Sequence, residues 1–564
     1  MNKYFQYILI VTLIALFWGP SLLLLVENSL DPLIFNDDVR QAVVPFFSDW
    51  NNELFVKDYA IAYERALIPI GTKLLYMAAA NYVSPDTFSS ILQLVLYLLL
   101  LITLAIVSYS LGDTRTMTAT LVLTLSSSIF LQRMVGGLSR SFAFPLMSLL
   151  ALALVKKSLL LNAFLVLLFA LFYPPMAQVS FYTLLALLLW KFKKTGKREK
   201  LRKVIVLGLT AILALLIVMP LLNVQEKYGP TIGIGELEDY PEAGPGGRYG
   251  FDDRPPFPSV FYALADIVGR TFQSGGGAFC PPAREWLYGK RTRGKPTYQL
   301  VVILTVMVLI MVSFSIGTIM KGEMEALLSL HLLLFAAILA YLLSCFFYPA
   351  LFVPWRAIVY PLPIFLVLLF PLSLLCLVQR LTDNPKRESI LFYLLLFCCF
   401  LFLGGRGAGD EGFKVNAHQE KALYEYIKSL PSTSIIAGFP KGVLDNVPYL
   451  CQKSALVTNE THQAFHKDYV REMRLRMELL LSAYFSTEKE KLVQLHKKYG
   501  VTHILIDLRH YTSGAPPKYF APFNKKIREL TSDKKRDDYI LLKVPARDFG
   551  HFRLINLSKV VSSS

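Results

Sequence analysis

The sequence predicts a polytopic α-helical membrane protein with a C-terminal α/β domain outside the cytoplasm. Three observations predict this fold class. Of the 564 residues, 54% are hydrophobic and only 18% are charged, a balance far from that of a soluble globular chain. Long apolar runs recur as far as residue 404. Beyond that point, short β-branched runs alternate with amphipathic helical patterns, which is typical of a small α/β domain with a partly parallel sheet.

The apolar runs predict about eleven membrane-spanning helices, because a span needs about 20 mostly apolar residues. Several runs are short, and those beside Lys156 and Pro174 also fit half-helices. The first run lacks a small-x-small cleavage site, so we expect an uncleaved anchor. The expected spans are 5–26, 91–111, 117–132, 141–155, 158–173, 176–190, 204–222, 299–320, 325–346, 357–379 and 389–404.

The basic residues predict the orientation of these spans. The formal net charge is +17, and the basic residues concentrate in short loops such as KFKKTGKREKLRK at 191–203. If Lys3 is cytoplasmic, strict alternation places every strongly basic short loop on the cytoplasmic side. We therefore expect an N-in, C-out protein with a transmembrane domain over 1–404 and an extracytoplasmic domain over 405–564. Nucleic-acid binding is disfavoured, because no basic and aromatic module surrounds the basic run.

Two outer segments precede the C-terminal domain. Residues 27–90 show apolar residues at helical spacing interrupted by charge, which predicts interfacial helices. Residues 223–298 are rich in Gly and Pro, match no phosphate-binding loop, and predict a flexible aromatic lid over a site. The aromatic residues of this second loop are Tyr240, Tyr249, Phe251, Trp286 and Tyr288.

The C-terminal domain and the cysteines show no metal-ligand pattern. We expect strands within STSIIAGF, SALVTNE, VTHILIDL and DYILLKV, and helices within 467–485 and 487–500. The six cysteines lack zinc-ligand spacing, and a Cys280–Cys451 disulfide is less favoured than two free thiols. Four irregularly spaced histidines are expected to be structural rather than ligands: His462, His466, His503 and His510.

Polar residues cluster just after the first apolar run, in LIFNDDVRQAVVPFF at 33–47. Carboxylates at a membrane face are costly unless they face water, protein or a cavity. Asp37 and Asp38 therefore have two interpretations: they cap the helix that follows, or one of them is a functional group on the outer face.

Two arginines are expected at the same outer face. Arg140 ends QRMVGGLSR, and Arg356 begins the next-to-last span after YPALFVPW. Each arginine either snorkels to lipid headgroups or grips a phosphate with its bidentate fork.

The chain resembles the GT-C class of integral-membrane glycosyltransferases. An acidic pair after a first N-in span, an outer loop of interfacial helices, many further spans and an outer C-terminal α/β domain carry the resemblance. So do three short stretches: WRAIVYPLP at 355–363, SRSFAFPLMSLLALALVKK at 139–157, and KKYGVTHILID. The resemblance covers most of the chain in layout, and its motifs are short and degenerate.

The resemblance implies an inverting transferase that moves a sugar from a polyprenyl-phosphate donor to a lipid, glycan or protein acceptor. The general base would be Asp37 or Asp38, and Arg356 with Arg140 would hold the departing phosphate. The chain has Asn-Asp-Asp-x-Arg where the class commonly has Asp-Glu or a lone Asp. Asn36 and Arg40 are therefore supporting candidates, and pairing of Arg40 with Asp37 or Asp38 would leave the base assignment open.

Two other functions fit the sequence. A non-catalytic scaffold would keep the layout and bind a protein partner through the aromatic loop and outer domain. A transporter is disfavoured because the spans contain few ionisable residues, of which His331 is the chief exception. We expect membrane lipids around the protein, no cofactor, no metal, and a location in a bacterial inner membrane with the C-terminal domain in the periplasm or outside the cell.

Overall fold

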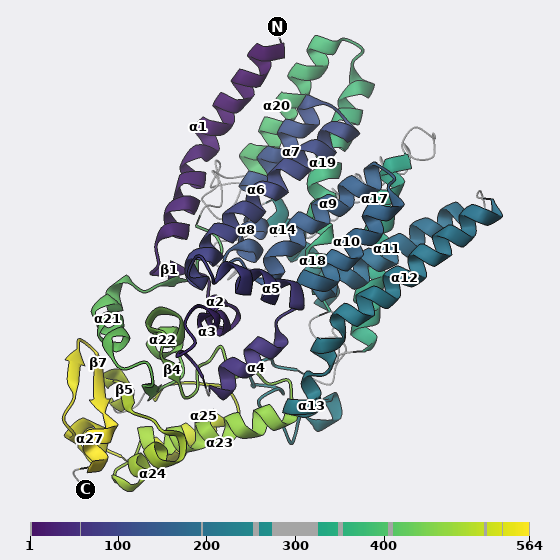
Figure 1. Cartoon of the computed structure of the whole chain (residues 1–564). Coiled ribbons are helices and arrows are strands. Elements are labelled where there is room, and N and C mark those ends of the chain that lie inside the picture. The colour runs from purple at the N-terminus through teal and green to yellow at the C-terminus, as the bar shows by residue number, and fades with distance from the viewer. Residues whose placement is uncertain are drawn as a thin grey trace.

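The computed structural model describes residues 3–56, 58–192, 196–251, 259–272, 325–347, 354–403, 410–512, 516–532 and 534–562. Figure 1 shows long helices in the upper part of the molecule and the C-terminal region, green to yellow, below them. The N-terminus lies at the far end of the helices from the C-terminal region (Figure 1).

Each expected span within the described residues coincides with a helix or a pair of helices. The expected span at 299–320 lies outside the described residues, and the predicted number of spans and their orientation stay predictions. The helices are α1 (Lys3–Leu30), α6 (Pro85–Leu111), α7 (Thr114–Ser126), α8 (Ser128–Met134), α9 (Ala143–Val155), α10 (Leu159–Phe172), α11 (Pro174–Phe192), α12 (Lys197–Leu222), α17 (Glu325–Phe346), α18 (Arg356–Val359), α19 (Pro361–Leu381) and α20 (Pro385–Leu403).

Four helical segments of the described residues are long and apolar enough to cross a bilayer: Pro85–Leu111, Lys197–Tyr228, Ala326–Phe346 and Arg356–Leu381. Helix α19 lies at the centre, where every side chain from Pro361 to Leu372 is buried. Helix α12 instead exposes apolar side chains such as Leu209, Ile212 and Leu216. An apolar surface of this kind is stable against lipid rather than water, so the helical part is that of a membrane protein.

Basic residues of the helical part lie at the start of α7, between α9 and α10, and in the first turns of α12. Arg115, in the first turn of α7, forms ion pairs with Asp113 and with Glu388 at the start of α20. Lys157 and Lys203 line one cavity between α9 and α12.

The outer segment after α1 folds into a short strand and several short helices. They are β1 (Ile34–Phe35), α2 (Val39–Ala42), the 3-10 helix η1 (Val44–Phe46), α3 (Phe47–Trp50), α4 (Tyr59–Leu67) and α5 (Ile70–Ala79). Proline explains the interruption between α4 and α5, because Pro69 precludes a continuous hydrogen-bond ladder. Asp58 caps α4 by accepting hydrogen bonds from the backbone of Ala60 and Ile61.

The second outer loop contains helices that the lid prediction did not include. They are α13 (Val224–Tyr228), η3 (Ile234–Glu236) and α14 (Ser259–Phe272). Helix α14 packs against α8 and α19, and its Ile267, Val268 and Phe272 are buried. The expected lid residues Trp286 and Tyr288 lie outside the described residues.

The C-terminal region holds a mixed five-stranded sheet in the order β4-β3-β5-β7-β6. The parallel strands are β3 (Ile435–Gly438), β4 (Ser454–Ala455) and β5 (His503–Asp507), and the antiparallel strands are β6 (Arg547–Phe549) and β7 (Phe552–Asn556). The accompanying helices are η4 (His418–Glu420), α21 (Lys421–Ser429), α22 (Val443–Cys451), α23 (Lys467–Tyr484), α24 (Glu490–Tyr499), η5 (Leu508–Tyr511), α25 (Phe523–Thr531), η6 (Arg536–Asp538), α26 (Ile540–Lys543) and α27 (Leu557–Ser562).

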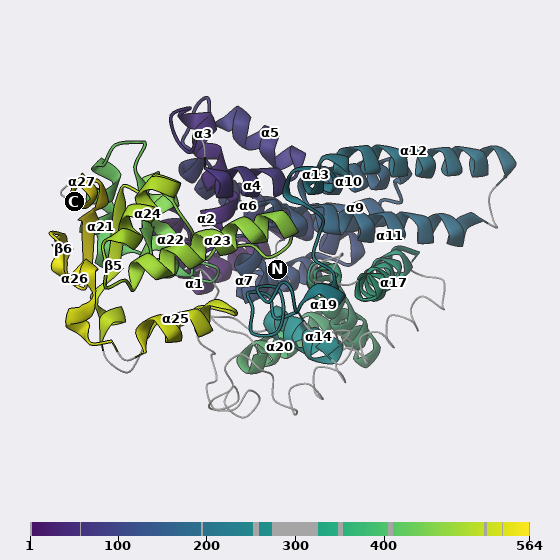
Figure 2. The same cartoon turned by 90° about the horizontal axis from the view of Figure 1, so that it is seen from below.

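Most of the expected C-terminal elements are confirmed, and one is wrong. DYILLKV was expected to be a strand, but it forms the end of η6 and the short helix α26, with Leu541 buried. The sheet is completed instead by the hairpin of β6 and β7, which turns at Gly550 with φ +62°. Seen from below, α23 runs from the sheet toward the membrane helices (Figure 2).

Candidate functional site

A cluster of charged side chains lies where the helical part meets the C-terminal region. We call it the mouth cluster: Asn36, Asp37, Asp38, Arg140, Arg356 and Lys414. Its residues come from four separate chain segments. The two-residue ladder between β1 and β2 (Val415–Asn416) fixes the first and last of these segments side by side, with Ile34 opposite Asn416 and Phe35 opposite Val415.

A close backbone approach brings Arg140 to this cluster. The loop before the 3-10 helix η2 (Ser139–Phe142) contains Gly136 and Gly137, both with positive φ. A Cβ on Gly136 would lie 3.1 Å from Val39 Cγ1 and 3.3 Å from Asn36 Cβ. Only glycine gives both this conformation and this proximity, so the loop lies directly against the Asn-Asp-Asp segment.

Asp38 is bound by Arg140 rather than used as a helix cap. Asp38 occupies the N-cap position of α2, but its side chain makes no capping hydrogen bond. Its Oδ2 instead pairs with Arg140 Nη1, while Arg140 Nη2 donates to Asn36 Oδ1 at 3.0 Å. Asn36 supports the turn by accepting a hydrogen bond from the Asp38 backbone N–H at 3.0 Å. The capping interpretation therefore does not describe Asp38.

The charges around Asp38 keep it ionised. Burial acts to raise the pKa of Asp38, but the positive charges of Arg140, Lys414 and Arg356 and the hydrogen bond from Arg140 outweigh it. The pKa of Asp38 consequently lies below its ordinary value. Arg356, at the start of α18, therefore lies within electrostatic range of Asp38.

Asp37 has a different environment. Its Oδ2 accepts a hydrogen bond from Lys414 Nζ at 2.9 Å. Its Oδ1 is buried, and among the described residues it has no hydrogen-bond partner. Arg140 Nε is likewise buried without a partner within the described part of the chain. The mouth cluster thus presents one unsatisfied acceptor and one unsatisfied donor, a costly arrangement unless a ligand completes it.

A third arginine adds to the positive charge beside Arg140. The Arg133 guanidinium stacks over the Trp355 ring, 4.5 Å from its centroid. Arg133 lies within electrostatic range of both Arg140 and Arg356. Guanidinium groups held this close together suit a multiply charged anion, because their mutual repulsion is relieved when it binds.

Arg40 pairs with neither aspartate side chain, so the alternative in which Arg40 occupies the base does not hold. Arg40 is buried and forms ion pairs with Asp445 Oδ2 at 3.1 Å and Glu460 Oε1 at 2.9 Å. Its Nη1 also donates to Asn446 Oδ1, and its Nε donates to the backbone oxygen of Asp37 at 2.8 Å. Arg40 therefore holds the turn that carries Asp37 against the C-terminal region.

The second outer loop contacts the same site. Tyr249 stacks on Phe465 with ring centroids 4.6 Å apart, and Arg248 pairs with Glu460 at 3.2 Å. The Tyr249 hydroxyl donates to Gln463, which hydrogen-bonds to Gln41, and Gln41 Nε2 donates to Asp38 Oδ1 at 3.4 Å. The described part of the predicted lid is thus a packed segment linked to Asp38 through two glutamines.

Each of the four histidines named in the sequence has a hydroxyl partner. In each one Nδ1 lies within hydrogen-bond distance of a hydroxyl oxygen: Tyr519 for His462, Tyr63 for His466, Thr502 for His503 and Tyr484 for His510. The described residues contain no group of three or more metal-ligating side chains. Cys451 is a free, buried thiol, while Cys280 lies outside the described residues, so their pairing is untested.

Sequence reasoning missed Lys414 and the acidic residues that bind Arg40. Lys414 lies 377 residues from Asp37 in the chain, and Glu460 lies 420 residues from Arg40. No local pattern marks such pairs, because each forms only when the last segment docks on the first.

No protein-family model matches the chain, and no curated protein matches it in sequence. Among solved structures, the chain is similar to the oligosaccharyltransferase of Archaeoglobus fulgidus in the apo form, with 11% identity and a TM-score of 0.48 over 96% of this chain and 73% of that chain. It is also similar to AglB of Archaeoglobus fulgidus in complex with an inhibitory peptide and a dolichol-phosphate (11% identity, TM-score 0.43, 88% and 70% covered). A third similarity is to ArnT of Cupriavidus metallidurans bound to undecaprenyl phosphate (12% identity, TM-score 0.41, 90% and 94% covered). At these identities and TM-scores the similarities assign no role to any residue.

Proposed function

We propose that the protein is an inverting glycosyltransferase that takes a sugar from a polyprenyl-phosphate donor at the outer membrane face. One observation carries this proposal: Asp37 Oδ1 and Arg140 Nε are both buried in the mouth cluster without a partner in the described structure. A sugar-transfer site needs an acceptor atom for the proton of the attacking hydroxyl and donor atoms for the departing phosphate. The two unsatisfied atoms supply one of each.

The proposed reaction is a single displacement. The acceptor hydroxyl attacks the anomeric carbon as its proton passes to a carboxylate, and the bond between that carbon and the phosphate oxygen breaks. The bonding electrons leave with the phosphate, whose growing negative charge Arg140 and Arg356 stabilise. Attack opposite the leaving group inverts the anomeric carbon.

Of the two carboxylates, Asp37 is the better candidate for the base. Its Oδ1 is unsatisfied among the described residues, whereas Oδ2 of Asp38 is paired with Arg140. Asp38 would then act as a positioning residue that orients Arg140 toward the phosphate. Lys414 Nζ, 2.9 Å from Asp37 Oδ2, would hold the second oxygen of that carboxylate in place.

The proposal includes the placement of the chain in the membrane. The basic connections would face the cytoplasm, and the mouth cluster with the C-terminal region would face the periplasm or the outside of a bacterial cell. The transmembrane domain would comprise 1–404 and the outer domain 405–564. The donor lipid and surrounding membrane lipids would contact the exposed apolar helix faces.

Native mass spectrometry of the purified full chain tests the donor. We expect a co-purified polyprenyl phosphate or polyprenyl-phosphate sugar on the wild type, and a weaker signal on Arg356→Ala. Arg387→Ala is the matched control, because Arg387 is exposed at the start of α20, at the opposite end of α19. Only non-specific phospholipid on all three proteins would contradict the donor site and favour the non-catalytic scaffold.

A further inference from the structure

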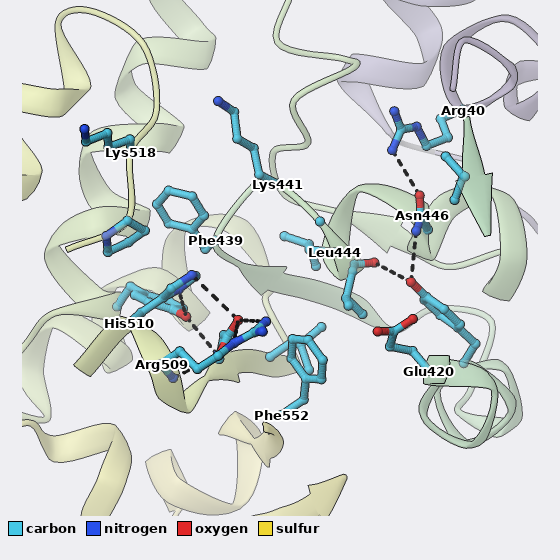
Figure 3. A pocket seen from close by; sticks show the side chains of 18 of the residues that line it. Arg40, Glu420, Phe439, Lys441, Leu444, Asn446, Arg509, His510, Lys518 and Phe552 are labelled. Carbon is cyan, nitrogen blue, oxygen red and sulfur yellow. Dashed lines mark hydrogen bonds and ion pairs between the residues drawn. The ribbon is translucent and has the colours of Figure 1, made fainter. Parts of the chain in front are cut away.

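A cavity lies beside the mouth cluster, in the C-terminal region. Its volume is about 630 Å³, within the range of small-molecule binding sites. Figure 3 shows Phe439 and Lys441, which follow β3, and Arg509 and His510, which follow β5, around it. Arg40 and Lys414 line its other side. We call this cavity the switch pocket, because the connections after β3 and β5 leave the sheet in opposite directions there.

The strand order places this cavity at a break in the topology of the sheet. After β3, the chain passes through α22 to β4 on one side, while β5 lies parallel to β3 on its other side. The loops at the carboxyl ends of β3 and β5 therefore leave in opposite directions and open a crevice between them. Open sheets with parallel strands bind their ligands in a crevice of this kind.

The charge of the lining selects the class of ligand. Five basic side chains and two acidic ones line the cavity: Arg40, Lys414, Lys441, Arg509 and Lys518, with Glu420 and Asp507. Arg509 holds Asp507 through hydrogen bonds of 2.7–3.1 Å to its carboxylate, which neutralises that acid. Arg40 and Lys414 are likewise paired, with Asp445 and Glu460 and with Asp37. Lys441 and Lys518 against Glu420 therefore leave one surplus positive charge in the lining, which favours an anion.

Two lysines of the lining have ammonium groups without a polar partner among the described residues. Among the described residues, neither Lys441 nor Lys518 has a hydrogen bond or an ion pair to its ammonium group; Lys441 only approaches the Tyr519 ring, at 5.2 Å. Partial burial, and then the charge of Arg248, lowers the pKa of Lys441. In the view of Figure 3 the two lysines stand on either side of Phe439.

The first turn of α22 also faces the cavity. Gly442, with φ +72°, precedes the helix, and Val443 and Leu444 of the first turn line the pocket. Backbone N–H groups at a helix start have no partner within the helix and attract anions. The start of α22 and the two lysines therefore both favour an anionic ligand in the cavity.

We propose that the switch pocket is a second binding site, for a sugar-sized ligand that carries a phosphate or carboxylate group. Lys441 and Lys518 bind the anionic group, and Phe439 supports the sugar ring. Lys414 both lines this pocket and contacts Asp37, so a ligand here lies next to the mouth cluster. The ligand is then the acceptor, an assignment that rests on the proposed transferase function.

Ligand-induced shifts in the thermal unfolding midpoint of the detergent-solubilised full chain test this site at constant ionic strength. The probes are glucose 6-phosphate, glucuronate, glucose and inorganic phosphate. We expect saturable stabilisation by the two anionic sugars and none by glucose. Inorganic phosphate is expected to bind more weakly than glucose 6-phosphate, and equal affinity would show an ion site without sugar recognition, overturning the proposal.

Two double variants locate the binding. Lys441→Gln with Lys518→Gln is expected to weaken glucose 6-phosphate binding at least about tenfold, the effect of losing one charge-assisted hydrogen bond. The control, Lys497→Gln with Lys498→Gln, removes the same charge from exposed positions at the end of α24. These positions precede the amino end of β5, whereas the pocket lies at its carboxyl end. Equal binding by wild type and the first variant, or an equal loss in the control, would refute the site.

If the double variant does not fold, Lys518→Gln alone replaces it, because Lys518 is exposed. The single variant should weaken glucose 6-phosphate binding several-fold.

The binding test is separate from the transferase function. Binding is measured without any donor, so its presence supports the pocket whether or not transfer occurs. Bound anionic sugars that never accept a sugar from any donor bound at the mouth cluster would overturn the acceptor assignment alone.

Discussion

Two adjacent aspartates at the mouth cluster are expected to differ in their effects on catalysis. Asp37→Asn removes the proposed base and should lower the transfer rate at least about 100-fold with little change in donor KM. Asp38→Asn leaves Arg140 without its ion pair, so we expect a higher donor KM as well as a lower rate. A transfer assay with the donor identified by mass spectrometry measures both.

The control for this pair is the unfolding midpoint of each variant, which should stay within a few degrees of the wild type. Asp468→Asn, at an exposed position in α23, is a neutral comparison with the same chemical change. Full activity in both Asp37→Asn and Asp38→Asn would remove the catalytic assignment and leave the scaffold function.

His462 predicts a pH-dependent loss of stability. Burial, with the charges of Arg248 and Arg474, lowers the pKa of His462 to about 3. The unfolded chain therefore binds a proton below about pH 6.5 that the folded chain excludes, and stability falls as the pH drops toward 3. We expect a loss of roughly 2 kcal/mol between pH 6 and pH 4.5.

The measurement is the difference in unfolding free energy between the wild type and His462→Gln across that pH range. The glutamine variant keeps a polar group beside Tyr519 and cannot become charged, so its stability should depend less steeply on pH. Parallel pH profiles for the two proteins would show that His462 does not remain neutral in the folded state.

At the scale of elements, the apolar runs predicted the helices well because length and continuity specify a membrane helix almost completely. The run expected at 357–379 is observed as α18 and α19, over Arg356–Leu381. The strand predicted for DYILLKV was wrong, because a short apolar run fits a buried helix turn as well as a strand. The hairpin of β6 and β7 offered only one local indication, the glycine at its two-residue turn.

The connection that carries Lys414 depends on a glycine that no pattern singled out. Gly412 has φ +92°, and a Cβ there would lie 2.7 Å from the Leu131 backbone oxygen. Its own oxygen accepts a hydrogen bond from Asn36 Nδ2 at 2.7 Å. Gly412→Ala should therefore cost about 2 kcal/mol of unfolding free energy and displace Lys414, which lowers the transfer rate.

Gly550→Ala is the control that separates the effect of a positive φ from the effect of a close contact. Gly550 also has positive φ, at +62°, but a Cβ there would have no atom within 4 Å. The Gly550→Ala variant should lose only about 1 kcal/mol of unfolding free energy and keep the wild-type transfer rate. Equal effects of the two alanine variants on both measurements would show that the contact of Gly412 with Leu131 is unimportant.

At the scale of the whole molecule, the site is an assembly that only the tertiary fold specifies. The sequence predicted that Asp38, Arg140 and Arg356 share one face, because topology alone decides which side of the membrane a loop reaches. It did not predict that Arg140 binds Asp38 or that Lys414 binds Asp37. Those contacts depend on glycine-permitted backbone approaches and on the docking of the C-terminal region, which periodicity does not encode.

Arg40 is expected to hold the two parts of the molecule together. It is buried between Asp445 and Glu460, and burial raises the pKa of both acids even beside Arg40 and Arg248. Arg40→Met removes the charge that compensates them, so we expect a loss of about 3–5 kcal/mol and faster hydrogen exchange in β1 and β2. The raised pKa values mean that the folded variant holds protons that the unfolded chain releases, so the loss of stability should be larger at pH 8 than at pH 5.

Two further variants serve as controls. Adding Glu460→Gln to Arg40→Met removes one uncompensated charge and should restore part of the stability. Lys421→Ala breaks only the exposed pair with Glu425 and should have little effect on stability. If Arg40→Met is as stable as Lys421→Ala, the helical and C-terminal parts are joined by the apolar contacts of Phe35 and Tyr449 and not by this buried charge cluster.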